Sequence, residues 1–233
     1  TGLGGTPGGL TVFGDDLNNT INIADNTGGE TRISAAGYPS FDFSGNNYSS
    51  FVVNAQAGID TIDLLSFGSN QDNDWPITLN GNTGNDTIRV RSTSSNTGLV
   101  TLNGNQGSDL FQLYDGTATA GTVDNIAGRV VVDGTDGDVA NFTDTLTIID
   151  NGDTSFDNVL VSAVNPTVNA DYAVEGINGL TGNDVTFRKV DVLTYTGPQG
   201  NDFIDGRFVN TTPTQHDLNI VSLSGWTGAD QFY

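Results

Sequence analysis

The 233-residue chain contains no cysteine and no methionine. Without cysteine it has no disulfides, no thiolate metal ligands and no thiol nucleophile. A chain of this length must therefore be stabilised by a large apolar core or by stacked repeats. No run approaches the roughly 18 apolar residues that a transmembrane helix needs, so we expect no membrane insertion.

Basic side chains are also scarce: 7 Lys and Arg stand against 28 Asp and Glu, giving a net charge of −21. Nucleic acids and anionic membranes are bound by clustered Lys and Arg, so nucleic acid is excluded as a partner. The basic residues are scattered, whereas a lyase of acidic sugars needs a basic cleft. The single histidine, His216, belongs to no recognisable catalytic motif and is interpreted as a loop residue. We predict that the chain is not an enzyme.

Helical patterns are missing as well. No segment has a sustained 3.6-residue apolar period with caps, and the 31 glycines are spread densely through the chain. Short runs in which apolar and polar residues alternate, such as 77–79, 87–90, 99–102 and 110–113, are typical of strands. The sequence therefore predicts an all-β protein.

One nine-residue pattern recurs along the chain, and its best copy is Asn80–Ile88, NGNTGNDTI. Each good copy lies between two alternating runs, which indicates a strand, a Gly-rich turn and a second strand. The copies are spaced about 24 residues apart on average, within the range of stacked structural repeats. The further copies begin at Asn54, Asn103, Asn178, Thr196 and Ser224, with degenerate ones at Phe13, Asp133 and Asn151.

This spacing predicts a parallel β-helix (solenoid) of about nine or ten coils, formed by residues 1–233 as one domain and expected to be a fragment of a longer repeat protein. The alternative is an antiparallel β-sandwich whose Asn-Gly pairs form hairpin turns. In the solenoid, Asn80, Asn103 and Asn178 would stack into an amide ladder. The residues that follow the corner Asn or its equivalent would take positive φ angles, as glycine does without strain: Gly81, Gly104, Gly179, Gly197 and Gly225.

The Gly-x-Asp end of each copy, for example Gly84-Asn85-Asp86, resembles half of the repeats-in-toxin nonapeptide, whose family binds calcium between successive turns. The copies here are 18–30 residues apart rather than nine. Over residues 10–233 the chain more closely resembles the repeat tracts of giant bacterial extracellular repeat proteins, namely surface-layer, matrix and filamentous-adhesin proteins. This resemblance implies an extracellular or cell-surface location.

Aspartates at one repeat position are the candidate metal ligands: Asp86, Asp109, Asp184, Asp202 and Asp230. Stacked coils would place them along one edge, where their mutual repulsion would be relieved by a cation, and calcium prefers such oxygen ligands. The alternative is that each carboxylate caps its turn by accepting backbone N–H bonds.

The function predicted from these features is that of a structural or adhesive extracellular repeat module, stabilised by calcium if the aspartates bind it. The alternative is a carbohydrate-binding or carbohydrate-processing β-helix protein, with Trp75, Tyr114 or Trp226 lining a concave face. Neither end of the sequence has a cap, so we expect further repeats or copies of itself to continue the stack end to end. Glycans are further candidate partners, because five sequons are present, at Asn18, Asn47, Asn85, Asn141 and Asn210.

Overall fold

The computed structural model describes residues 8–26, 29–44, 48–67, 75–94, 97–135, 142–155, 157–163, 172–177, 185–208, 220–225 and 228–232. These residues form strands, turns and loops but no helix, which confirms the all-β prediction. Within them, accordingly, nothing helical is present that could span a membrane.

Two large sheets contain nearly all of the strands. The first has ten strands in the spatial order β1 (Leu10–Phe13), β5 (Phe51–Asn54), β7 (Trp75–Thr83), β9 (Thr97–Gln106), β13 (Val130–Thr135), β17 (Val185–Arg188), β16 (Tyr172–Glu175), β15 (Asn158–Ala163), β19 (Phe203–Phe208) and β21 (Gln231–Phe232). The second has nine, in the order β20 (Ile220–Ser224), β18 (Val192–Thr196), β14 (Thr145–Ile149), β10 (Leu110–Leu113), β8 (Thr87–Val90), β6 (Thr61–Leu64), β2 (Thr20–Asn26), β3 (Glu30–Ala35) and β4 (Phe41–Ser44). A separate hairpin, β11 (Asp115–Thr117) with β12 (Ala120–Thr122), belongs to neither large sheet.

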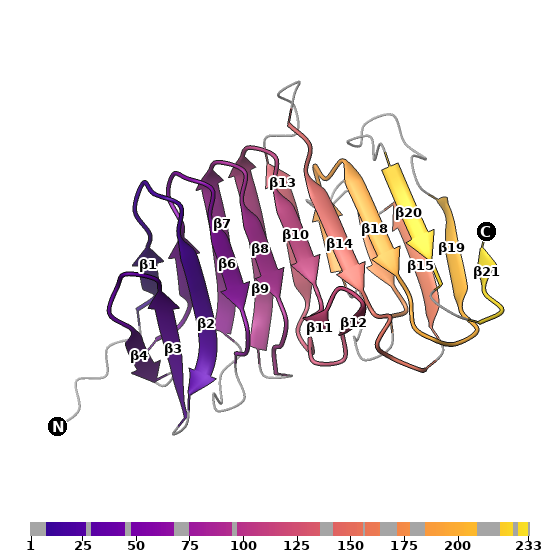
Figure 1. The fold of residues 1–233 in the computed structure, drawn as a ribbon, viewed down its shortest axis with the longest axis horizontal. Helices are drawn as coiled ribbons and strands as arrows, with labels where there is room; N and C mark the ends of the chain where they lie inside the picture. The colour runs from indigo at the N-terminus through magenta and orange to yellow at the C-terminus, as the bar shows by residue number, and fades with distance from the viewer. Residues whose placement is uncertain are drawn as a thin grey trace.

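Along most of its length the chain passes from one sheet to the other and back, so that each strand lies beside one from the previous pass. Figure 1 shows these passes advancing in chain order from the N-terminal to the C-terminal end. Neighbours within a sheet are parallel and in register, as in β5–β7–β9 and β6–β8–β10. Antiparallel pairs are confined to β2–β3–β4, β15–β16–β17 and the β11–β12 hairpin.

The described strands make seven such passes, from β1–β2 to β19–β20, and β21 begins an eighth. This number is below the expected nine or ten. Gly-rich corners occur at both edges of the sheets, so the corners that begin at Asp133 and Asn151 belong to one pass rather than two. Strands β3 and β15–β16 also lengthen individual passes by folding back within a sheet.

The core lies between the two sheets and repeats from pass to pass, because alternate residues of a strand face the same side. Leu79 of β7 is paired with Leu102 of β9, and Ile88 of β8 with Phe111 of β10; all four are fully buried. Leu110, by contrast, pairs with Thr87 on the outward face.

The positive-φ prediction for the first glycine of each corner was wrong wherever it can be checked. Gly81, Gly104, Gly197 and Gly225 do not have positive φ; Gly179 lies outside the described residues. The left-handed glycine is the second one, at Gly58, Gly84, Gly107 and Gly228, with φ between 135° and 144°.

Candidate functional site

The corners that lead from the first sheet to the second carry a continuous row of aspartates. In each corner the backbone N–H of one pass donates to the carboxylate of the next: Asp60 N to Asp86 Oδ1 at 2.8 Å, and Asp86 N to Asp109 Oδ1 at 2.8 Å. The row extends in both directions, from the amide of Asn19 to Asp60, and through Asp144 to Asp191. We call this row the first aspartate ladder. It shows that these carboxylates accept backbone N–H bonds, as the capping interpretation predicted, but from the corner of the preceding pass rather than from their own turn.

A second aspartate ladder occupies the corners that lead back from the second sheet to the first. The amide of Asp157 donates to Asp202 Oδ1 at 3.2 Å, and that of Asp202 to Asp230 Oδ1 at 3.1 Å. These corners follow the C-terminal ends of second-sheet strands, so they lie at the edge opposite the first ladder.

The five predicted metal ligands are therefore not on one edge. Asp86 and Asp109 belong to the first ladder, Asp202 and Asp230 to the second, and Asp184 lies outside the described residues. A ligand role for the five stays a prediction. Sequence reasoning overlooked Asp144 and Asp191, because their corners lack the Asn-Gly-x-x-Gly spacing.

Two further rows of side chains join the same corners. Asn80 Nδ2 donates to Asn54 Oδ1, and Asn103 Nδ2 to Asn80 Oδ1, both at 2.7 Å, which confirms the amide ladder for Asn80 and Asn103 and adds Asn54 to it. Asn178, also predicted for this ladder, lies outside the described residues. The residue before the aspartate makes a third row, in which Asn85 Oδ1 accepts the amide of Ser108 at 2.9 Å. The corner from Asn80 to Asp86 thus binds its neighbours through three polar side chains.

The glycines make this close stacking possible for two different reasons. A Cβ on Gly81 would lie 2.4 Å from Asp86 Oδ2, so the first glycine leaves room for the carboxylate of its own corner. A Cβ on Gly84 would lie 1.5 Å from the carbonyl oxygen of Gly58, so the second glycine allows contact between successive backbones. The repeat therefore requires both glycines, although only the second has a left-handed backbone.

The ladder carboxylates are buried with one oxygen unused. Oδ2 of Asp60, Asp86 and Asp202 is shielded from solvent and accepts no hydrogen bond. Burial raises the pKa of Asp86 to about 6, against the opposing effect of the Asp60 amide. Burial likewise raises the pKa of Asp60 and Asp202. Charging these groups therefore costs free energy in the folded protein.

At the edge of the second ladder the structure brings together three aspartates that no sequence motif connected. One carboxylate oxygen each from Asp124, Asp150 and Asp153 lie within 4.8 Å of one another, an arrangement that could hold a metal ion. Asp124 follows β12, and the other two follow β14. Only the general abundance of aspartate hinted at this group, because its members come from separate loops.

Most of the arginines are engaged by carboxylates. Arg91 makes a two-pronged contact with Asp63, at 2.9 and 2.8 Å, and Arg89 approaches the same carboxylate at 3.5 Å. Arg188 is paired with Asp133, and Arg32 with Asp42. These pairs neutralise single carboxylates rather than forming a basic cleft.

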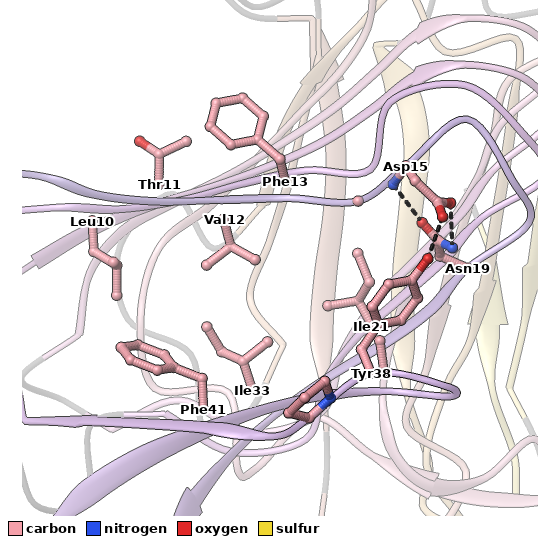
Figure 2. Close-up of a pocket in the computed structure, with 13 residues that line it drawn as sticks. Leu10, Thr11, Val12, Phe13, Asp15, Asn19, Ile21, Ile33, Tyr38 and Phe41 are labelled. Atoms are coloured by element: carbon pink, nitrogen blue, oxygen red, sulfur yellow. Dashed lines mark hydrogen bonds between the residues drawn. The ribbon is translucent and has the colours of Figure 1, made fainter.

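The aromatic residues predicted to line a sugar-binding face are in the core where they can be checked. Trp75 is 3% exposed and Tyr114 5% exposed; Trp226 lies outside the described residues. A cavity of about 440 Å³ lies instead at the N-terminal end, between β1 and the β3–β4 hairpin. Figure 2 shows Leu10, Val12, Ile33 and Phe41 facing it, with the hydrogen-bonded group of Asp15, Asn19 and Tyr38 beside them.

No protein-family model, no curated protein and no solved structure matches this chain. The functional argument therefore depends on the geometry of the corners and on the chemistry of their side chains.

Proposed function

We propose that this chain is a structural or adhesive repeat module of a bacterial surface layer, matrix or filament, without catalytic activity. The observation that carries the proposal is the use of the corner side chains. Asn80, Asn85 and Asp86 each form a side-chain hydrogen bond with an adjacent pass. A repeat whose corner side chains form hydrogen bonds between its own successive passes is suited to building an extended scaffold.

For the architecture we infer a parallel β-solenoid with two sheets. Its support is the alternation of strands between sheets and the parallel registers at intervals of 23 and 26 residues in β6–β8–β10. Every inner strand of such a stack is hydrogen-bonded on both sides, so stiffness grows with the number of passes. The antiparallel sandwich is disfavoured because antiparallel pairing is local.

End-to-end growth is part of the proposal. Among the described strands, β1 and β21 are the edges of the first sheet, and β4 and β20 of the second. The backbone N–H groups of Leu10 and Gly14 donate to carbonyl oxygens at the two ends of β5. Because N–H groups alternate in direction along a strand, the N–H of Thr11 points to the unpaired edge of β1. Unpaired edges of this kind pair with another chain unless they are blocked. We propose that further repeats or copies of the same chain do so.

Analytical ultracentrifugation of the chain, alone and with Thr11→Pro, tests this assembly. Proline removes the edge amide without breaking the pairing to β5, so it should abolish association. Thr11→Val, which keeps the amide, should associate like the wild type. A wild-type chain that stays monomeric over the whole concentration range, or a Thr11→Pro variant that still associates, would contradict the proposal.

Calcium is the cation we propose for the acidic corners. They offer carboxylate oxygens, which suit a hard cation, and the chain has no cysteine and a single histidine for softer metals. An extracellular or cell-surface location, supported by the resemblance of the repeats to bacterial surface proteins, belongs to the same proposal.

The N-terminal cavity favours one second candidate, the binding of a carbohydrate. Tyr38 and Phe41 are about half exposed there, at 54% and 49%, and Asp15 and Asn19 supply polar atoms beside them. Aromatic faces next to a few polar groups suit a sugar ring. Glycan-array binding that Tyr38→Ala abolishes would support this function, and an array without any signal would reject it.

A further inference from the structure

The carboxylates of Asp124, Asp150 and Asp153 meet where two loops are already fastened together. The amide of Val123 donates to Asp150 Oδ1 at 3.0 Å, and the amide of Gly121 donates to Asn151 Oδ1 at 2.9 Å. The loop after β12 and the corner after β14 therefore have fixed relative positions. A ligand between them would find its site formed in advance.

Asp150 has a buried carboxylate oxygen without a hydrogen-bond partner. Its side chain is fully buried, at 0% exposure, and its Oδ2 accepts no hydrogen bond. Because both oxygens share one carbon, Oδ2 lies in or directly beside the three-carboxylate group. A buried carboxylate oxygen without a partner costs free energy, which a cation would recover.

The charges around Asp150 add to this cost. Burial is the main reason that the pKa of Asp150 is raised to about 8, and the carboxylates of Asp157 and Asp124 raise it further. The Val123 amide and the Thr122 hydroxyl oppose the shift.

We propose that Asp124, Asp150 and Asp153 form a calcium site that pins the β12–β13 loop to the corner between β14 and β15. The inference deepens the proposed function, and it relies on that proposal only for the identity of the ion.

The three carboxylate oxygens lie within 4.8 Å of one another, close enough for a single ion to bind all of them. Calcium is favoured over magnesium because it accepts irregular coordination by carboxylates and water, whereas Mg²⁺ demands near-ideal octahedral geometry. Asp124 is exposed, so water can complete the coordination.

Isothermal titration calorimetry of the chelator-treated full chain with CaCl₂ and with MgCl₂ tests the site. Asp150→Asn and Asp124→Asn each remove one ligand charge, and Asp16→Asn removes one charge at an exposed position elsewhere. Calcium should bind the wild type and Asp16→Asn equally, with at least about tenfold weaker binding to the other two, because affinity follows ligand charge.

Circular dichroism shows whether each variant is folded, so that lost binding is not confused with lost structure. Absence of calcium binding by the folded wild type, or undiminished binding by folded Asp150→Asn, would overturn the site. The site would also be overturned if Asp86→Asn lost all calcium binding while Asp150→Asn bound calcium normally, because the ion would then be bound at the first aspartate ladder. These results are independent of the ultracentrifugation that tests end-to-end assembly, so the two proposals can fail separately.

Discussion

Replacing Asp86 by asparagine should make the protein less sensitive to pH. Asp86 is 1% exposed, and its Oδ1 accepts the Asp60 amide while its Oδ2 accepts nothing. Asparagine keeps an acceptor oxygen for that amide and removes the buried charge. The variant should therefore keep the ladder and lose the cost of ionising it.

The magnitude follows from the pKa of Asp86, which rises from 3.8 to about 6 on folding. The folded protein then binds this proton more tightly than the unfolded chain does. The stabilisation is fully present below pH 3.8 and is lost as the pH rises through about 6. The shift corresponds to about 3 kcal/mol in all, of which about 2 kcal/mol falls between pH 4.5 and 7.5.

Urea unfolding of both proteins at several pH values in this range, with chelator present, measures the effect. The range avoids the isoelectric point near 4.1, where solubility is lowest. The free energy of unfolding of Asp86→Asn minus that of the wild type should increase by about 2 kcal/mol from pH 4.5 to 7.5. Asp16→Asn, an exposed change of equal charge, provides the baseline. A difference that stays constant with pH would refute the reasoning about the buried carboxylate.

Three other substitutions test the corners and the core by thermal or urea unfolding. Gly84→Ala should destabilise the protein strongly or prevent folding, because the new Cβ would clash with the Gly58 carbonyl oxygen. Gly37 is the control, since it also has a positive φ but a Cβ there would meet nothing within 4 Å. Gly37→Ala should therefore cost only about 1–2 kcal/mol of stability. Equal effects of the two would contradict backbone stacking. Asn80→Asp, which replaces the donor to Asn54 with a second acceptor, should cost about 1–3 kcal/mol at pH 7, and an unchanged midpoint would argue against the amide ladder. Leu79→Ala should cost about 2–5 kcal/mol, as for a fully buried leucine, and a much smaller loss would count against the packed core.

Much of the repeating part of the fold could be predicted, because its signals are local. The strands around Asn80 and Asn103 show a clear two-residue alternation, and their closely similar corners favour the same register in successive passes. The Asn80–Asn103 contact follows directly from that register. The glycine conformations could not be predicted in this way, since they depend on which backbone lies beneath each corner.

The placement of the aspartates illustrates a different limit. The motif does not say from which sheet a corner starts, so Asp86 and Asp202 looked equivalent although they lie on opposite edges. The group of Asp124, Asp150 and Asp153 arises from the docking of one loop against another. The loop of Asp124 carries no copy of the repeat, and the corner at Asn151 carries only a degenerate one. Contacts between segments of different sequence do not produce a repeating sequence pattern, so they could not be predicted from one.

Disulfide trapping tests the central claim, the in-register parallel stacking of successive passes, most directly. The chain has no native cysteine, and Thr78 pairs with Thr101 on the outward face of β7 and β9. Adjacent parallel strands lie about 4.8 Å apart, within the Cα separation that a disulfide spans. Thr78→Cys with Thr101→Cys should therefore cross-link under mild oxidation, and Thr78→Cys with Thr147→Cys, on the other sheet, should not. Failure of the first pair, or equal cross-linking of both, would contradict the account.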